Sequence, residues 1–148
     1  MPGLEDLYRE IILDHYKNPR NRGSLEAPAV SATGHNPLCG DEIEVYLLVE
    51  DGRVADVRIA GQGCSISQSS ASMMSAAVKG RPVAEVRALV SRFKHMMSID
   101  EEPLDDAAQI APLGDLEALQ GVVKFPVRIK CAVLAWNTLL EALEAAPA

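Results

Sequence analysis

Three cysteines and one aspartate are the residues of this chain whose types and positions suit metal or thiol chemistry. Cys39 and Asp41 flank a glycine, so a thiolate and a carboxylate can approach each other across a tight turn. Cys64 precedes a predicted helix, whose unpaired N–H groups favour a thiolate. Cys131 lies three residues after Arg128, on the same face of another predicted helix. Three thiolates and one carboxylate suit tetrahedral zinc or an iron–sulfur cluster.

Spacing alone does not separate a metal site from three unrelated buried cysteines. The gap between Cys64 and Cys131 is 67 positions, whereas structural zinc sites use close pairs of cysteines. An odd number of cysteines without an export signal indicates metal binding, thiol chemistry or burial rather than a disulfide framework. The elements that carry the cysteines must decide between these interpretations.

A β-hairpin is predicted over residues 43–59, because apolar residues alternate on both sides of an Asp-Gly pair. Two registers are possible for it. A two-residue loop pairs Glu50 with Arg53, and a three-residue loop pairs Val49 with Arg53. We favour the three-residue loop, because it sets apolar residues opposite apolar residues on the face that becomes buried.

Either register brings candidate metal ligands together at one end of this hairpin. The two-residue loop places Cys39 opposite Cys64, and the three-residue loop places it opposite Gly63. Cross-strand neighbours lie about 5 Å apart. We therefore expect Cys39, Asp41 and Cys64 to meet there.

Hydrophobic periodicity predicts four helices and one further strand around the hairpin. The helices are expected over 4–16, 65–79, 83–97 and 127–145, and the strand over 30–33. Acidic residues and two prolines mark 98–118 as an excursion within a single domain that spans 1–148. The fold class expected is α/β (α+β).

Composition excludes several classes of function. The chain has 148 residues and a net charge of −7, which argues against nucleic acid and anionic membrane surfaces as partners. Its 48% hydrophobic content is too high for a disordered chain. No apolar run is long enough to span a bilayer, and the N-terminus lacks a secretory signal. These features predict a cytoplasmic protein.

The segments around the three cysteines resemble the motifs of a known family. The sequences NPLCGD at 36–41, GQGCSIS at 61–67 and RIKCA at 128–132 are similar to the cysteine motifs of the IscU/NifU/SufU family of iron–sulfur assembly proteins. The segment 7–21, with DHY and PRN, resembles that family's N-terminal helix and following turn. The resemblance extends over about 7–143, and three motifs in this order are a specific signal.

This resemblance implies a fold, a site and partners. The implied fold is a small antiparallel sheet with helices packed on one face, IscU/SufU-like. The implied site uses Cys39, Asp41, Cys64 and Cys131 to hold either Zn²⁺ or a labile [2Fe–2S] cluster. The implied partners are a cysteine desulfurase, which supplies sulfur as a persulfide, and apo iron–sulfur acceptor proteins.

The resemblance implies two functions. The first is a scaffold that receives sulfur from the desulfurase and passes a labile cluster to apo-proteins. The alternative is a zinc-dependent sulfur acceptor, a sulfurtransferase that activates the desulfurase and holds no cluster. Lys130, where IscU-type members carry histidine, and the acidic excursion are typical of the SufU branch, which favours the alternative. The segment 124–128 departs from the family's chaperone-recognition motif, which argues against a dedicated Hsp70-type chaperone.

Within this implied site the cysteines have different expected roles. We expect Cys39 to be the sulfur acceptor, because it lies on a glycine-flexed loop, with Cys131 as its rival. Arg128 and Lys130 are expected to offset the negative charge of four anionic ligands. A purely structural zinc domain is a third possibility, and a Cys–His hydrolase is disfavoured because no local nucleophile signature is present.

We do not expect the three histidines to take part in the chemistry of the site. We expect His15 to cap the end of the first helix, where a cation is favoured. His35 is expected to face solvent on a loop rather than to serve as a spare ligand, and His95 to lie on a helix surface.

Overall fold

One three-stranded sheet and five helices make up the part of the chain that the computed structural model describes, residues 4–37, 40–97 and 113–146. In chain order the elements are α1 (Leu4–Lys17), β1 (Val30–Asn36), β2 (Asp41–Glu50), β3 (Arg53–Gln62), α2 (Ser65–Val78), α3 (Val83–Met96), the 3₁₀ helix η1 (Gly114–Lys124) and α5 (Pro126–Ala145). The strands are antiparallel in the order β1-β2-β3. The predicted fold class is therefore confirmed.

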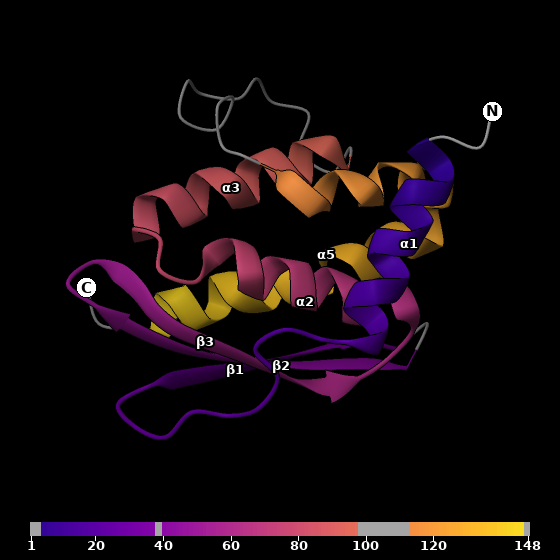
Figure 1. Cartoon of the computed structure of the whole chain (residues 1–148). Helices are drawn as coiled ribbons and strands as arrows, with labels where there is room; N and C mark the ends of the chain where they lie inside the picture. The colour runs from indigo at the N-terminus through magenta and orange to yellow at the C-terminus, as the bar shows by residue number, and fades with distance from the viewer. Residues whose placement is uncertain (1–3, 38–39, 98–112, 147–148) are drawn as a thin grey trace.

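The helices lie on one face of the sheet in two layers (Figure 1). α2 and α5 lie directly over the strands, with α5 against β1 and β2 and α2 against β3. α1, α3 and η1 form the outer layer, and α1 crosses α2 near the end where β2 begins. This arrangement buries the alternate residues of β2 that face the helices and leaves their neighbours half-buried.

The hairpin register differs from both predicted registers. Glu50 pairs with Arg53 across a two-residue Asp-Gly turn, as in the register that we did not favour. A bulge after Leu48 then shifts the ladder by one residue. The shift sets Val45 opposite Ile59, so apolar residues still face one another. The buried face does decide the register, but a bulge achieves this instead of a longer turn.

The predicted helices are observed within one or two residues of their expected ends. The strand expected over 30–33 extends to Asn36. The excursion expected over 98–118 falls outside the described residues up to 112, and the remainder enters η1. No helix among the described residues is long and apolar enough to cross a membrane.

A stacked pair of aromatic rings joins the two helical layers. Phe93 on α3 and Trp136 on α5 are fully buried, with ring centroids 4.4 Å apart. The Trp136 indole N–H donates to Ser70 Oγ on α2, at 3.1 Å. Ser70 in turn donates to the carbonyl of Ala132, one residue after Cys131. These contacts fix the start of α5 against α2.

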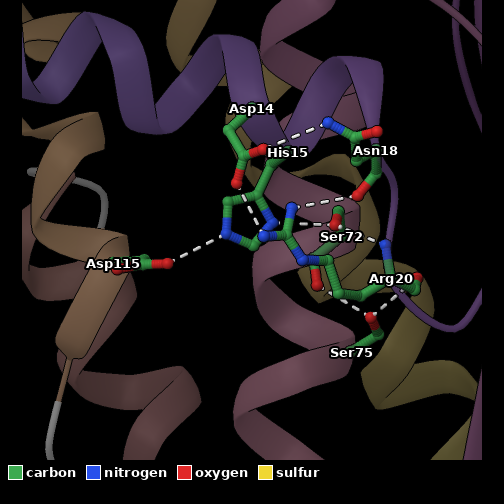
Figure 2. Close-up of polar contacts among 7 residues, drawn as sticks. All are labelled: Asp14, His15, Asn18, Arg20, Ser72, Ser75 and Asp115. Atoms are coloured by element: carbon green, nitrogen blue, oxygen red, sulfur yellow. Dashed lines mark hydrogen bonds and ion pairs between the residues drawn. The ribbon is translucent and has the colours of Figure 1, made fainter.

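His15 ties α1 to α2 and η1, so the role of helix cap predicted for it is wrong. It is only 2% exposed. Its Nδ1 lies 2.8 Å from Ser72 Oγ, and its Nε2 lies 3.0 Å from Asp115 Oδ2 (Figure 2). Ser72 Oγ also accepts the backbone N–H of Arg20. Residues 57 and 100 positions away from His15 are thus joined through one imidazole.

This Ser–His–Asp arrangement is structural rather than hydrolytic. A cavity of about 190 Å³ borders His15 and Asp115, but Ser72 is not among the residues that line it. Ser72 is fully buried, and its oxygen already contacts His15 and Arg20. A substrate therefore has no access to this hydroxyl.

A second set of contacts closes the turn after α1 (Figure 2). Arg20 Nη2 lies 2.6 Å from Asp14 Oδ2, and the side-chain amide of Asn18 donates to Asp14 Oδ1. The Arg20 and Asn18 hydrogen bonds hold the pKa of Asp14 below its usual value. A lowered carboxyl pKa means that this contribution to folding stability is present at neutral pH and is lost as the pH falls through that pKa.

Replacing His15 tests how much its contacts with Ser72 and Asp115 contribute to the free energy of unfolding. His15→Ala is expected to lower the free energy of unfolding by about 2–4 kcal/mol, because it leaves a cavity and two partners without their contacts. Denaturant titration of the metal-free protein measures the change. His95→Ala is the matched control, because His95 is exposed on α3, as predicted, and should change stability by less than about 0.5 kcal/mol. Equal effects of the two substitutions would contradict the anchoring role.

Candidate metal centre

Three candidate ligands from three different elements converge at one end of the sheet. Asp41 is the first residue of β2, Cys64 immediately precedes α2, and Cys131 lies in the second turn of α5. One ligand atom from each residue lies within 4.8 Å of the other two. The expected meeting of Asp41 and Cys64 is confirmed, and Cys131 joins them from the other end of the chain.

The carboxylate of Asp41 is held in place by the start of α2. Asp41 is 2% exposed, and its Oδ1 accepts the backbone N–H of Cys64 at 2.8 Å. Its Oδ2 lies 3.9 Å from Cys64 Sγ. Gly63 makes this approach possible, because a Cβ at that position would collide with Asp41 Oδ1 and Ser67 Oγ. One helix N-terminus therefore orients both a carboxylate and a thiol.

The fully buried sulfur of Cys131 has polar contacts with Asn36 and Val127. The side-chain amide of Asn36 donates to Cys131 Sγ at 3.6 Å. The thiol donates to the carbonyl of Val127 at 3.8 Å, one helical turn earlier. Cys64, in contrast, is partly exposed. The two thiols therefore occupy different environments within one site.

This donor set fits a metal ion. Thiolate and carboxylate groups are ligands of zinc, and adjacent sulfurs around a tetrahedral zinc at about 2.3 Å lie about 3.8 Å apart. No two of the three ligand atoms are more than 4.8 Å apart, so each pair needs to close by at most about 1 Å. Three ligands leave one tetrahedral position for a fourth. Asp41, Cys64 and Cys131 are therefore a candidate metal centre.

The other residues discussed for the site differ in where the structure places them. Cys39 lies outside the described residues, so its role stays a prediction. Arg128 and Lys130 are exposed at the start of α5, and within the described part of the chain neither forms a side-chain hydrogen bond or ion pair. His35 is exposed, as expected, although it lies on β1 rather than on a loop.

Sequence reasoning missed the contact of Asn36 with Cys131. In the sequence Asn36 is the first residue of the first cysteine motif, with no role of its own indicated. It is 6% exposed and pairs across the sheet with Asp41. The signal available was its position at the end of an alternating strand, but its partner lies 95 positions away, and local patterns do not reach that far.

An antiparallel sheet covered on one face by helices, with thiols and a carboxylate gathered at one end, defines a class of protein. It is the class of iron–sulfur cluster assembly and sulfur acceptor proteins. A family model described as the NifU-like N-terminal domain matches residues 7–132. The chain belongs to this family, which includes the IscU and SufU proteins.

Individual relatives span nearly the whole chain. It is 46% identical over 136 residues to the zinc-dependent sulfurtransferase SufU of Bacillus subtilis, which covers 92% of this chain and 88% of the relative. It is 40% identical to the iron–sulfur cluster assembly scaffold protein IscU of Streptococcus pyogenes, over 95% and 85% of the two chains. The crystal structure of a SufU from Fervidobacterium islandicum, described as a scaffold of the SUF system, has a TM-score of 0.79 at 30% identity, over 95% and 99%.

Proposed function

We propose that this protein is a zinc-dependent sulfur acceptor for a cysteine desulfurase, the alternative of the two functions that the sequence indicates. The observation that carries this proposal is the convergence of Asp41, Cys64 and Cys131 in a chain 46% identical to a zinc-dependent sulfurtransferase. Lys130, at the position before the third cysteine, also favours this branch over the scaffold.

In this proposal Cys39 completes the ligand set and receives the sulfur. A two-residue link spans at most about 7 Å, so a residue two positions from Asp41 can reach the same ion. Bound zinc would keep the thiols that hold it deprotonated at neutral pH. Cys131 is the weaker acceptor candidate, because it is fully buried whereas a partner's persulfide must approach from outside.

The transfer itself is a thiol–persulfide exchange. The thiolate of Cys39 attacks the outer sulfur of the desulfurase persulfide, and a new S–S bond forms on Cys39. The S–S bond of the donor breaks, and its cysteine leaves as a thiolate. The transferred sulfur keeps its proton, so no oxidant or reductant is consumed.

The surface beside the site offers a place for the desulfurase. Phe125 and Val127 are large apolar residues that are 61% and 57% exposed, and they precede Cys131 by six and four residues. Exposed Lys124, Arg128 and Lys130 share this segment in a chain whose net charge is −7. An apolar patch rimmed by cations fits a partner with an acidic rim.

A scaffold for a labile iron–sulfur cluster is the second candidate function. The IscU relatives support it, and so does the carboxylate of Asp41. Three thiolates hold iron firmly, while a carboxylate is a weaker partner that leaves one position easy to exchange. The same residues would hold the cluster as cargo.

Anaerobic reconstitution separates the two functions. The protein is incubated with a cysteine desulfurase, cysteine and ferrous iron, and then with an apo-ferredoxin. We expect retained zinc, faster desulfurase turnover and no visible charge-transfer chromophore. A chromophore that forms on the protein and moves to the ferredoxin would contradict the sulfur-acceptor proposal and establish the scaffold.

A further inference from the structure

The contact between Asn36 and Cys131 links the end of β1 to the start of α5 at the candidate metal centre. Asn36 is the last residue of β1, and only four residues separate it from Asp41, its partner across the sheet. Its side chain reaches across to α5, where Nδ2 donates to Cys131 Sγ at 3.6 Å. Both residues are buried, at 6% and 0% exposure, so water does not compete for this hydrogen bond.

We propose that Asn36 is a positioning residue for the metal centre, and that it sets the donor strength of the Cys131 thiolate through an N–H···S hydrogen bond. This inference rests on the proposed function, because it assumes that Cys131 binds the metal. Residues that hydrogen-bond to metal ligands orient them and commonly change metal affinity about 10- to 100-fold.

The chemistry of the contacts that Val127 and Asn36 make with Cys131 distinguishes their roles. The thiol donates its proton to the carbonyl of Val127, and this contact is lost when the sulfur becomes a thiolate. The amide of Asn36 donates to the sulfur, and this contact strengthens when the sulfur gains negative charge. Of these two contacts, only the one from Asn36 supports the metal-binding form.

A donated hydrogen bond withdraws electron density from a thiolate. Cys131 is therefore a weaker electron donor and a weaker nucleophile than the same sulfur without Asn36. Cys64 contacts the carboxylate of Asp41 instead, an acceptor that withdraws no charge from its sulfur. The site is thus asymmetric: Cys131 is the less nucleophilic thiolate, and the attack on a persulfide is left to another thiolate.

Cobalt substitution tests this inference, because sulfur-to-Co²⁺ charge-transfer bands report the electron density on the ligating sulfurs. Asn36→Leu keeps the branching at Cγ and has no hydrogen-bond donor. We expect its charge-transfer band to move to lower energy than in the wild type. Its affinity for zinc, measured by competition with a chromophoric chelator, is expected to fall by about 10- to 100-fold.

Two further variants keep the experiment decisive. Asn36→Ser is too short to reach the sulfur but remains polar, so it replaces Asn36→Leu if the latter does not fold. Thr138→Val is the matched control, because Thr138 is buried at the same contact of α5 with β1, where it packs against Gly34 and donates to the Leu134 carbonyl. Its cobalt spectrum and zinc affinity should match those of the wild type.

The outcomes separate this inference from the proposed function. Lower zinc affinity with an unmoved cobalt band would show that Asn36 only supports the fold, and would overturn the inference. An unchanged affinity would overturn it as well. Failure of the wild-type protein to bind cobalt would instead overturn the metal centre itself, and this inference with it.

Discussion

Cys64→Ser is expected to lower the affinity for zinc by more than about 100-fold and to abolish activation of the desulfurase. Even residues that only hydrogen-bond to metal ligands commonly contribute 10- to 100-fold, so the loss of a ligand should exceed that range. A serine hydroxyl stays protonated at neutral pH and is a poor zinc ligand. Chelator competition and desulfurase turnover measure the two effects.

The partial exposure of Cys64 makes this substitution informative. The side chain is not part of the buried core, so a serine of nearly the same size should leave the fold intact. Ser65→Ala is the matched control, because Ser65 is also partly buried at the start of α2 and carries no ligand atom. If Cys64→Ser unfolds the protein rather than silencing it, the zinc is structural and the sulfur-acceptor proposal fails.

Asp41→Asn is expected to weaken zinc binding by about 100-fold while preserving the local structure. The amide oxygen of asparagine can still accept the backbone N–H of Cys64, which Asp41 Oδ1 accepts at 2.8 Å. The substitution therefore removes charge and ligand strength but keeps the hydrogen bond that starts α2. Zinc content after dialysis and isothermal titration measure the result.

The neighbouring residue provides the control for charge. Glu42→Gln removes the same charge from the adjacent position of β2, where the side chain points to the opposite face of the sheet. It should retain zinc at the wild-type level, and a loss equal to that of Asp41→Asn would contradict the assignment of Asp41 as a ligand.

Asp41→Asn also tests the second candidate function, the scaffold for a labile cluster. If the protein carries a cluster, loss of the carboxylate should make that cluster bind more tightly and move more slowly to an apo-ferredoxin. Transfer at the wild-type rate would exclude Asp41 as the exchangeable ligand of a scaffold.

The sequence by itself determined the elements and the identity of most site residues. Helical and strand periodicity placed every helix of the inner layer, since a buried face repeats at 3.6 or 2 residues whatever it packs against. The glycine-flanked Cys39 and Cys64 segments, together with the motif around Cys131, indicated the family and the donor set. These are local patterns, and their spacing along the chain is sufficient to recognise them.

Only the tertiary structure decided which distant groups touch. The bulge after Leu48 depends on which side chains the helices bury, and no local pattern specifies an extra residue there. The sequence predicts that His15 caps the end of α1, yet packing of α1 between α2 and η1 buries it against Ser72. Asn36 meets Cys131 only because α5 lies across β1. Each contact joins segments that are far apart in sequence, so packing of the whole domain, rather than propensity, determines it.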